Sequence, residues 1–177
     1  RSSRGLGDVY KRQAVGSLAL DANTTANSNV AMGYNSLGAN TTGDQQTAVG
    51  TYALQANTTG VQNSAFGSTA LYSNTTADNN TAIGFQALYT NTTGTRNVAV
   101  GAYALDANST GNYNVALGYG SLGANTASNN VAIGYDALTA NTTGGNNIAV
   151  GYQALNANTT ASTSVAIGYQ ALYTCTT

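Results

Sequence analysis

The feature that most constrains this sequence is a short tandem repeat. A good example is NVAVGAYALDANSTGNY, residues 97–113, and ten copies are recognisable by the pattern N-[VTSI]-A-Φ-G-x-x-[AS]-L-x-[AST]-N-[TS]-T-[GA]-x-x, where Φ is apolar, although the first lacks its start and the last stops in mid-repeat. The copies recur every 17 residues, with one interval of 16 before Gly134. A repeat this short predicts a solenoid in which each copy forms one coil and stacks on its neighbours. Positions 1 to 17 below refer to this pattern.

Positions 2 to 4 predict a short strand. The residues are β-branched or apolar around an invariant Ala, so positions 2 and 4 share one face and the Ala lies on the other. A Gly ends the strand at position 5, which suits a bend that tolerates no Cβ. The strand-ending glycines of the complete copies are Gly33, Gly50, Gly67, Gly84, Gly101, Gly118, Gly134 and Gly151.

Position 9 is always Leu, and position 4 is always apolar. Stacked in register, these two columns predict a continuous interior. Each fully buried large side chain is expected to stabilise the fold by about 1.5–3 kcal/mol. The small Ala at position 3 predicts close approach of another backbone. Gly and the NTT triplets leave no uninterrupted helical stretch, so a helical repeat is disfavoured. The Leu column comprises Leu37, Leu54, Leu71, Leu88, Leu105, Leu122, Leu138 and Leu155.

Position 12 is Asn in every complete copy. Identical residues at the coil spacing of about 4.8 Å can form an amide ladder along the axis, as stacked Asn does in cross-β structures. The predicted ladder contains Asn40, Asn57, Asn74, Asn91, Asn108, Asn141 and Asn158. All of these residues also begin N-[TS]-T glycosylation sequons, and Asn79 matches through Asn-Asn-Thr, but a ladder followed by a turn is the favoured explanation of the triplet.

Aromatic residues occupy two neighbouring positions after the Gly. Most copies carry the ring at position 6, as in Tyr34 and Phe85, whereas Tyr52 and Tyr103 stand at position 7. A one-residue shift would reverse the face in a regular strand. This segment is therefore expected to be a bend or a partly exposed rim.

Charge and composition exclude several classes of function. The chain is only 6% charged, against about 25% in ordinary domains, and Arg96 is the only cation after residue 13. Such a body cannot neutralise a phosphate backbone, so nucleic acid is not an expected partner. No apolar run reaches the roughly 18 residues of a membrane span, so no membrane insertion is expected.

No catalytic, cofactor or metal site is predicted. The chain has no His and no Glu, and the Asp residues fall at varied repeat positions. Cys175 has no His partner and is interpreted as an irrelevant thiol or a sequence-end error. The stretch GYGSLG, residues 118–123, looks like a phosphate-binding loop but is a variant of the repeat.

Two stretches, NVAIGYDALTANTTGGN and NIAVGYQALNANTTAST, resemble the head repeats of YadA-type trimeric autotransporter adhesins. They resemble even more the NTAVGYQAL…NTTG arrays of tail-fibre-like proteins from bacteria and viruses. The resemblance covers residues 14–177. It implies a left-handed parallel β-roll that trimerises and is displayed outside the cell, on a cell surface or a virion fibre. The period of 17 is longer than is usual in the adhesin heads.

Two functions follow as hypotheses for this all-β parallel β-solenoid of about ten coils. The first is a structural segment of an extracellular fibre or adhesin, self-associating as a homotrimer and meeting a host-surface or glycan receptor. The second is an ice-binding solenoid that uses its Thr columns, although adjacent Thr residues point to opposite faces, so that at most one per coil joins a given face.

The first 13 residues, RSSRGLGDVYKRQ, do not belong to the repeat. They carry four of the five cations, and they join the array inside a copy, directly before Ala14. A natural cap would join at a turn, so we interpret residues 1–13 as a non-native, adapter-derived segment and expect them to be disordered. The alternative is a basic arm or a polar cap. Residues 14–177 are interpreted as the repeat array, truncated at both ends.

Overall fold

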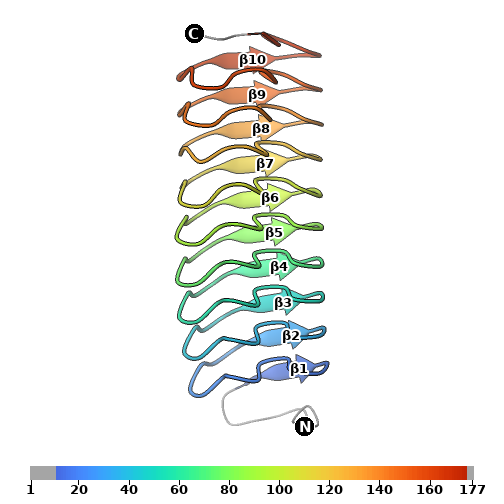
Figure 1. Cartoon of the computed structure of the whole chain (residues 1–177), viewed down its shortest axis with the longest axis vertical. Coiled ribbons are helices and arrows are strands. Elements are labelled where there is room, and N and C mark those ends of the chain that lie inside the picture. Colours follow the sequence, from blue (N-terminus) through green and yellow to red (C-terminus); the bar gives the residue numbers. More distant parts are fainter. Residues whose placement is uncertain (1–10, 175–177) are drawn as a thin grey trace.

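The computed structural model describes residues 11–174, and its regular secondary structure within that range is a single parallel sheet. Ten strands of three residues each lie side by side in sequence order (Figure 1). The strands are β1 (Gln13–Val15), β2 (Val30–Met32), β3 (Thr47–Val49), β4 (Ser64–Phe66), β5 (Thr81–Ile83), β6 (Val98–Val100), β7 (Val115–Leu117), β8 (Val131–Ile133), β9 (Ile148–Val150) and β10 (Val165–Ile167).

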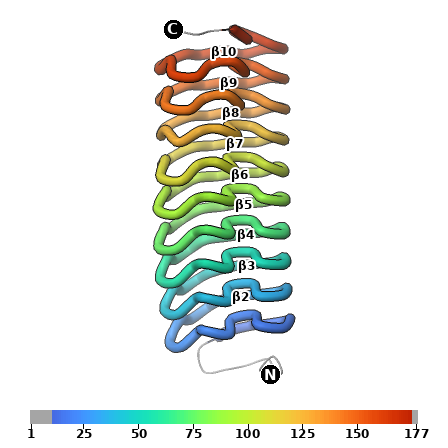
Figure 2. Tube along the Cα trace, viewed as in Figure 1, coloured from blue at the N-terminus to red at the C-terminus, as the bar shows by residue number. Residues whose placement is uncertain are grey.

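Each repeat forms one coil of a β-solenoid, as the sequence predicts. The strands pair with equivalent positions in register, for example Ala82 with Ala99, and the connections run across the opposite side of the rod (Figure 2). The 16-residue copy keeps this register, because Ala116 still pairs with Ala132. The missing residue is thus absorbed in a turn, where a change of length is better tolerated.

The start of the array falls close to the predicted boundary. Strand β1 begins at Gln13, one residue before Ala14, and Gln13 pairs with Val30. The partly buried Arg12 donates from Nη1 to the carbonyl of Asn23 at 3.4 Å. The expected disorder of residues 1–13 therefore does not extend to Gln13, which lies in β1. Residues 1–10 lie outside the described residues, so for them the proposal of a non-native, disordered segment stays a prediction.

Glycine is required where each strand ends. At Gly84 the backbone has φ +136°, and an added Cβ would lie 2.6 Å from the carbonyl carbon and oxygen of Gly101 in the next coil. Both features exclude a side chain. The expectation of a bend without Cβ is confirmed at this position, and the same geometry recurs from Gly16 to Gly151.

Three further positions in each coil, 7, 9 and 17, lie in the left-handed region. The invariant Leu of position 9 is among them, with φ between 49° and 54° in the ten copies from Leu20 to Leu172. A left-handed residue with a side chain is disfavoured by roughly 1–2 kcal/mol. The coil tolerates these bends because their amides are used: the N–H of Leu54, for example, donates to Ala70 O of the next coil at 3.0 Å.

The interior is narrower than the sequence predicts. The Leu column and the Ala residues of positions 3 and 8 fill it, and from Leu37 to Leu155 every Leu of the column is fully buried. The apolar residues of position 4, which were expected to line the same interior, point outward instead; Met32 is 45% exposed and Ile83 is 42% exposed. The prediction that positions 2 and 4 share a face holds, but the inward face is the Ala face.

Candidate functional site

The position-12 asparagines form the predicted amide ladder inside the rod. Except in the 16-residue copy, Nδ2 donates to Oδ1 of the preceding coil, as Asn74 does to Asn57 at 2.9 Å and Asn91 does to Asn74 at 3.0 Å. The same Nδ2 also donates to the carbonyl three residues later, such as Gly94 O from Asn91 at 3.0 Å. From Asn40 to Asn158 these residues are fully buried. The ladder therefore holds consecutive coils together within a sealed core, where such bonds are strong.

A second buried amide column, not expected from the sequence, occupies position 1. The backbone N–H of Asn80 donates to Asn63 Oδ1 at 2.9 Å, and Asn80 Nδ2 donates across its own coil to Gly94 O at 2.8 Å. The signal was present, since position 1 is Asn in most copies. The members of the column are Asn29, Gln46, Asn63, Asn80, Asn97, Asn114, Asn130 and Asn147.

The 16-residue copy interrupts the first ladder. Among the described residues, Asn108 Oδ1 is the buried side-chain atom that has no hydrogen-bond partner. Asn125, the equivalent residue of the short copy, donates from Nδ2 to Ala127 O at 2.9 Å instead of to Asn108. Asn125 Oδ1 accepts from Asn130 at 3.2 Å and from Asn141 at 2.7 Å, so the ladder continues from Asn125 to Asn141.

The outward side of the sheet forms an uncharged, largely apolar surface. We call this surface the apolar face; it consists of positions 2 and 4 of β2 to β10 and contains no charged residue. Phe66 and Ile167 are exposed, and the position-2 residues Thr47 and Val98 are half-buried. A contiguous apolar surface that runs over many coils is typical of an interaction site.

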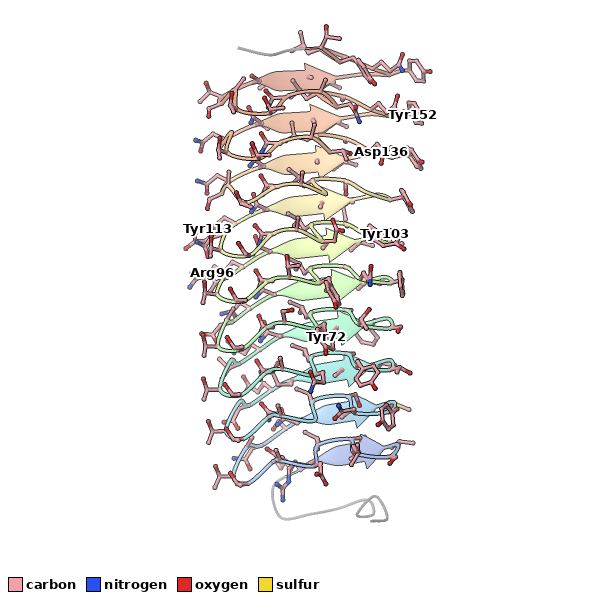
Figure 3. The ribbon with its side chains drawn as sticks, in the orientation of Figure 1. Tyr72, Arg96, Tyr103, Tyr113, Asp136 and Tyr152 are labelled. Carbon is pink, nitrogen blue, oxygen red and sulfur yellow. The ribbon has the colours of Figure 1, made fainter. Side chains whose placement is uncertain are left out.

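Aromatic side chains gather where the strands end. We call this column the tyrosine edge; it comprises Tyr34, Tyr52, Phe85, Tyr103, Tyr119, Tyr135, Tyr152 and Tyr169. Tyr72 and Tyr89 stand at position 10, further along the coil, where they stack on each other, and Tyr72 also contacts Tyr52. Rings at positions 6 and 7 meet directly: the centroids of Phe85 and Tyr103 are 5.4 Å apart in an edge-on pair. The expectation of a bend is confirmed, because these residues lie in a turn. Tyr103 and Tyr152 are labelled on this edge in Figure 3.

The two Thr positions of the NTT triplet differ in exposure and bonding. At position 13 the hydroxyl of Thr58 donates to the carbonyl of Thr75 in the next coil at 3.1 Å. At position 14 the Thr side chains, such as Thr59 and Thr76, are exposed. One Thr per 17-residue coil is thus exposed to solvent as a column, which the 16-residue copy interrupts because it lacks position 14.

The ladder also bears on the glycosylation sequons. The nitrogen that would carry a glycan is Nδ2, and in residues such as Asn74 this atom is buried and donates two hydrogen bonds. The sequon at Asn79 differs, because Asn79 stands at position 17 and is exposed. Any glycan on a ladder Asn would require the coil to open.

The charged residues form no cluster on the described part of the rod. Residues 11–174 contain no group of three or more His, Cys, Asp or Glu that could hold a metal ion, and Cys175 lies outside the described range. Burial raises the pKa of Asp106, against hydrogen bonds from its own and the next backbone amide, and burial also raises the pKa of Asp136. Arg96 donates to the hydroxyl of Tyr113 at 2.9 Å on the opposite edge from Tyr103 (Figure 3). Within the same residues, no helix is long and apolar enough to cross a membrane.

The fold therefore defines the class of protein, a parallel β-solenoid whose outward features are an apolar face, a tyrosine edge and a Thr column. Comparison with known proteins adds no closer assignment. No family model, curated protein or solved structure matches the chain.

Proposed function

We propose that the repeat array is a structural segment of an extracellular fibre or adhesin, of the cell-surface or tail-fibre type, and that it self-associates as a homotrimer. The observation that carries this proposal is the apolar face. Nine successive strands present outward residues at positions 2 and 4, none of them charged. Surfaces of this kind are stabilised by burial against another apolar surface.

A second copy of the chain is the partner that fits this face best. A straight column of equivalent residues along one rod is complementary in length and spacing to the same column on a parallel rod. Three rods arranged around a common axis would cover all three apolar faces, as in the adhesin heads that the repeat resembles, and a left-handed coil would complete that resemblance. The tyrosine edges and Thr columns would remain available to a host-surface or glycan receptor.

The rod itself suits a structural role. Its core contains hydrogen-bonded amides and Leu rather than reactive groups, and apart from the 16-residue copy the coils repeat the same ladder contacts. Stability then increases with the number of coils, which favours long spacers. We propose no catalysis and no cofactor for this segment.

Sedimentation equilibrium of the purified chain tests the proposal. A trimer of the 17.8 kDa chain has a mass of 3 × 17.8 = 53.4 kDa. The variant Phe66→Glu/Ile83→Glu places two charges on the apolar face and is expected to sediment as a monomer. The control Thr76→Glu/Thr93→Glu adds the same charges to exposed residues of the same two coils and is expected to remain trimeric. A monomeric wild-type chain would contradict the proposal.

The exposed Thr column favours ice binding as a second candidate. It offers one hydroxyl and one methyl group per 17-residue coil, at a spacing of about 4.8 Å, and is interrupted at the 16-residue copy. The position-13 hydroxyls are already bonded to backbone carbonyls, as in Thr58, which leaves a single column instead of a broad face. Thermal hysteresis that is abolished in Thr76→Glu/Thr93→Glu would support this candidate, and the absence of hysteresis in the wild-type chain would exclude it.

A further inference from the structure

The upper part of the tyrosine edge is a stack of parallel phenol rings. Tyr119, Tyr135, Tyr152 and Tyr169 follow one another in consecutive coils. Their ring centroids are 5.3, 5.5 and 5.2 Å apart, and neighbouring ring planes differ by only 10°, 12° and 8°. All four rings are exposed, between 42% and 74%. Stacked aromatic contacts at this separation are favourable, so the rings are held next to one another.

This arrangement follows from the repeat. Each of the four tyrosines stands at position 6, directly after the strand-ending Gly, so the in-register coils bring their Cα atoms about 4.8 Å apart. The side chains point the same way because the local backbone is the same in each coil. The phenol groups are therefore neighbours before any reaction takes place.

We propose that this stack is a site of oxidative modification, at which one-electron oxidation by a peroxidase and hydrogen peroxide joins tyrosines of consecutive coils as dityrosine. Each of two phenols gives up one electron and one proton to form a phenoxyl radical. Hydrogen peroxide accepts the two electrons and two protons and becomes two molecules of water. The radicals form a carbon–carbon bond between their ortho carbons, and the two ortho hydrogens then move to the oxygens, which restores both phenols.

Proximity together with parallel stacking determines which pairs react, so the edge-on pairs Tyr34–Tyr52 and Tyr103–Tyr119 are not among them. Phenoxyl radicals on adjacent rings couple within one rod, because the reacting rings are already held together and the step is intramolecular. The pairs expected to couple are Tyr119–Tyr135, Tyr135–Tyr152 and Tyr152–Tyr169, and also Tyr72–Tyr89, whose rings stack at 5.2 Å. The bond would join consecutive coils at the rim of the rod, in addition to the hydrogen bonds of its core.

Tyr113 provides a contrast within the same chain. It is exposed and stands on the opposite edge, where it contacts the guanidinium of Arg96 and forms no ring pair with any residue between 11 and 174. Equal exposure without a stacked neighbour should give oxidation without intrachain coupling. The inference is independent of the proposed fibre function, because it concerns a single rod and does not need the apolar face.

The test uses two variants with the same composition. Tyr135→Phe/Tyr169→Phe leaves Tyr119 and Tyr152 two coils apart, about 10 Å along the axis. Tyr119→Phe/Tyr135→Phe leaves Tyr152 and Tyr169 as neighbours. Phe can still stack, so both variants should fold alike, and circular dichroism before oxidation checks this.

The full chain and both variants are treated with a haem peroxidase and hydrogen peroxide at low protein concentration. Mass spectrometry then measures the loss of two hydrogens per cross-link in chains of monomer mass, and the linked peptides are identified after proteolysis. We expect linked peptides from the four-tyrosine stack in the wild-type chain and in Tyr119→Phe/Tyr135→Phe, but not in Tyr135→Phe/Tyr169→Phe. Equal coupling in the two variants, intrachain links at Tyr113 as abundant as those in the stack, or links only between chains would overturn the proposal.

Discussion

Replacing one ladder Asn tests whether the buried amides stabilise the rod. Asn74→Ala removes two donated bonds, to Asn57 Oδ1 at 2.9 Å and to Ala77 O at 3.1 Å, and one accepted bond, from Asn91 Nδ2 at 3.0 Å. Two of the former partners keep another bond: Ala77 O accepts from Asn63 Nδ2, and Asn91 Nδ2 donates to its own turn. Asn57 Oδ1 is left buried without a donor.

The expected loss follows from these contacts. A buried oxygen left without its donor destabilises by about 1–3 kcal/mol, and a lost hydrogen bond by about 1 kcal/mol more. We therefore expect Asn74→Ala to lower the free energy of unfolding by about 2–4 kcal/mol. Urea unfolding followed by circular dichroism measures the midpoint and the slope together.

Asn108→Ala is the matched control. Asn108 makes the same two donated bonds, to Asn91 Oδ1 at 3.1 Å and to Gly111 O at 3.1 Å, but its own Oδ1 has no partner. Its replacement removes no accepted bond and also removes a buried unpaired oxygen. The loss should therefore be smaller than for Asn74→Ala by at least about 1 kcal/mol. Equal losses, or a larger loss at Asn108, would refute the reasoning.

Three more perturbations follow from the structure. Inserting Thr between Thr126 and Ala127 restores the missing position 14 of the short copy and lets Asn125 donate to Asn108. Urea unfolding should then show that the free energy of unfolding rises by about 1–3 kcal/mol. The same insertion after Thr92, in a regular copy, should lower the free energy of unfolding. Gly84 has φ +136°, and Gly84→Ala would place a Cβ 2.6 Å from the carbonyl of Gly101, so this variant should lower the thermal unfolding midpoint sharply. The control Gly145→Ala, whose Cβ would meet only Ser128 O at 3.2 Å, should change the midpoint little. Because burial raises the pKa of Asp106, the folded chain holds that proton more tightly than the unfolded chain does, so this group's contribution to stability falls as pH rises from the ordinary Asp pKa through the raised one. A pH series of unfolding midpoints should show this fall in the wild-type chain and a smaller one in Asp106→Asn; identical pH profiles would contradict the assignment.

The period of the sequence was sufficient to predict the architecture. Because a 17-residue copy is too short for a helical pair and contains one β-branched segment, it had to form one coil, and the stacking of identical positions then predicted the Asn ladder at Asn57 and Asn74. The bend after the strand could also be predicted, because Tyr34 at position 6 and Tyr52 at position 7 could lie on the same edge only if the chain bends there.

Strand alternation could not tell which face was inside. It groups positions 2 and 4 on one face, but the choice between Ala99 and Val100 as the interior residue depends on the width of the coil. That width is set by the Leu column and by two buried amides per coil, which leave room only for Ala. A hydrophobic residue such as Ile83 was therefore assigned to the interior although the structure exposes it.

Two other features had weak signals. The position-1 column was visible as a repeated Asn, but its role depends on a bond across the coil, from Asn80 to Gly94, that no local pattern specifies. The left-handed Leu residues could not be expected, because Leu disfavours that conformation and adopts it here only because the closed coil requires it.

The most direct test of the central claim, that each repeat is one coil of a straight rod, is a pair of spin-label distances. Labels are placed on cysteines at the exposed residue Thr42 and at either Thr110 or Thr143, in a Cys175→Ser background diluted with unlabelled chain. The second label lies four or six coils from the first, so pulsed dipolar spectroscopy should give separations near about 19 Å and about 29 Å. Distances that fail to increase in proportion to the number of coils would contradict the solenoid.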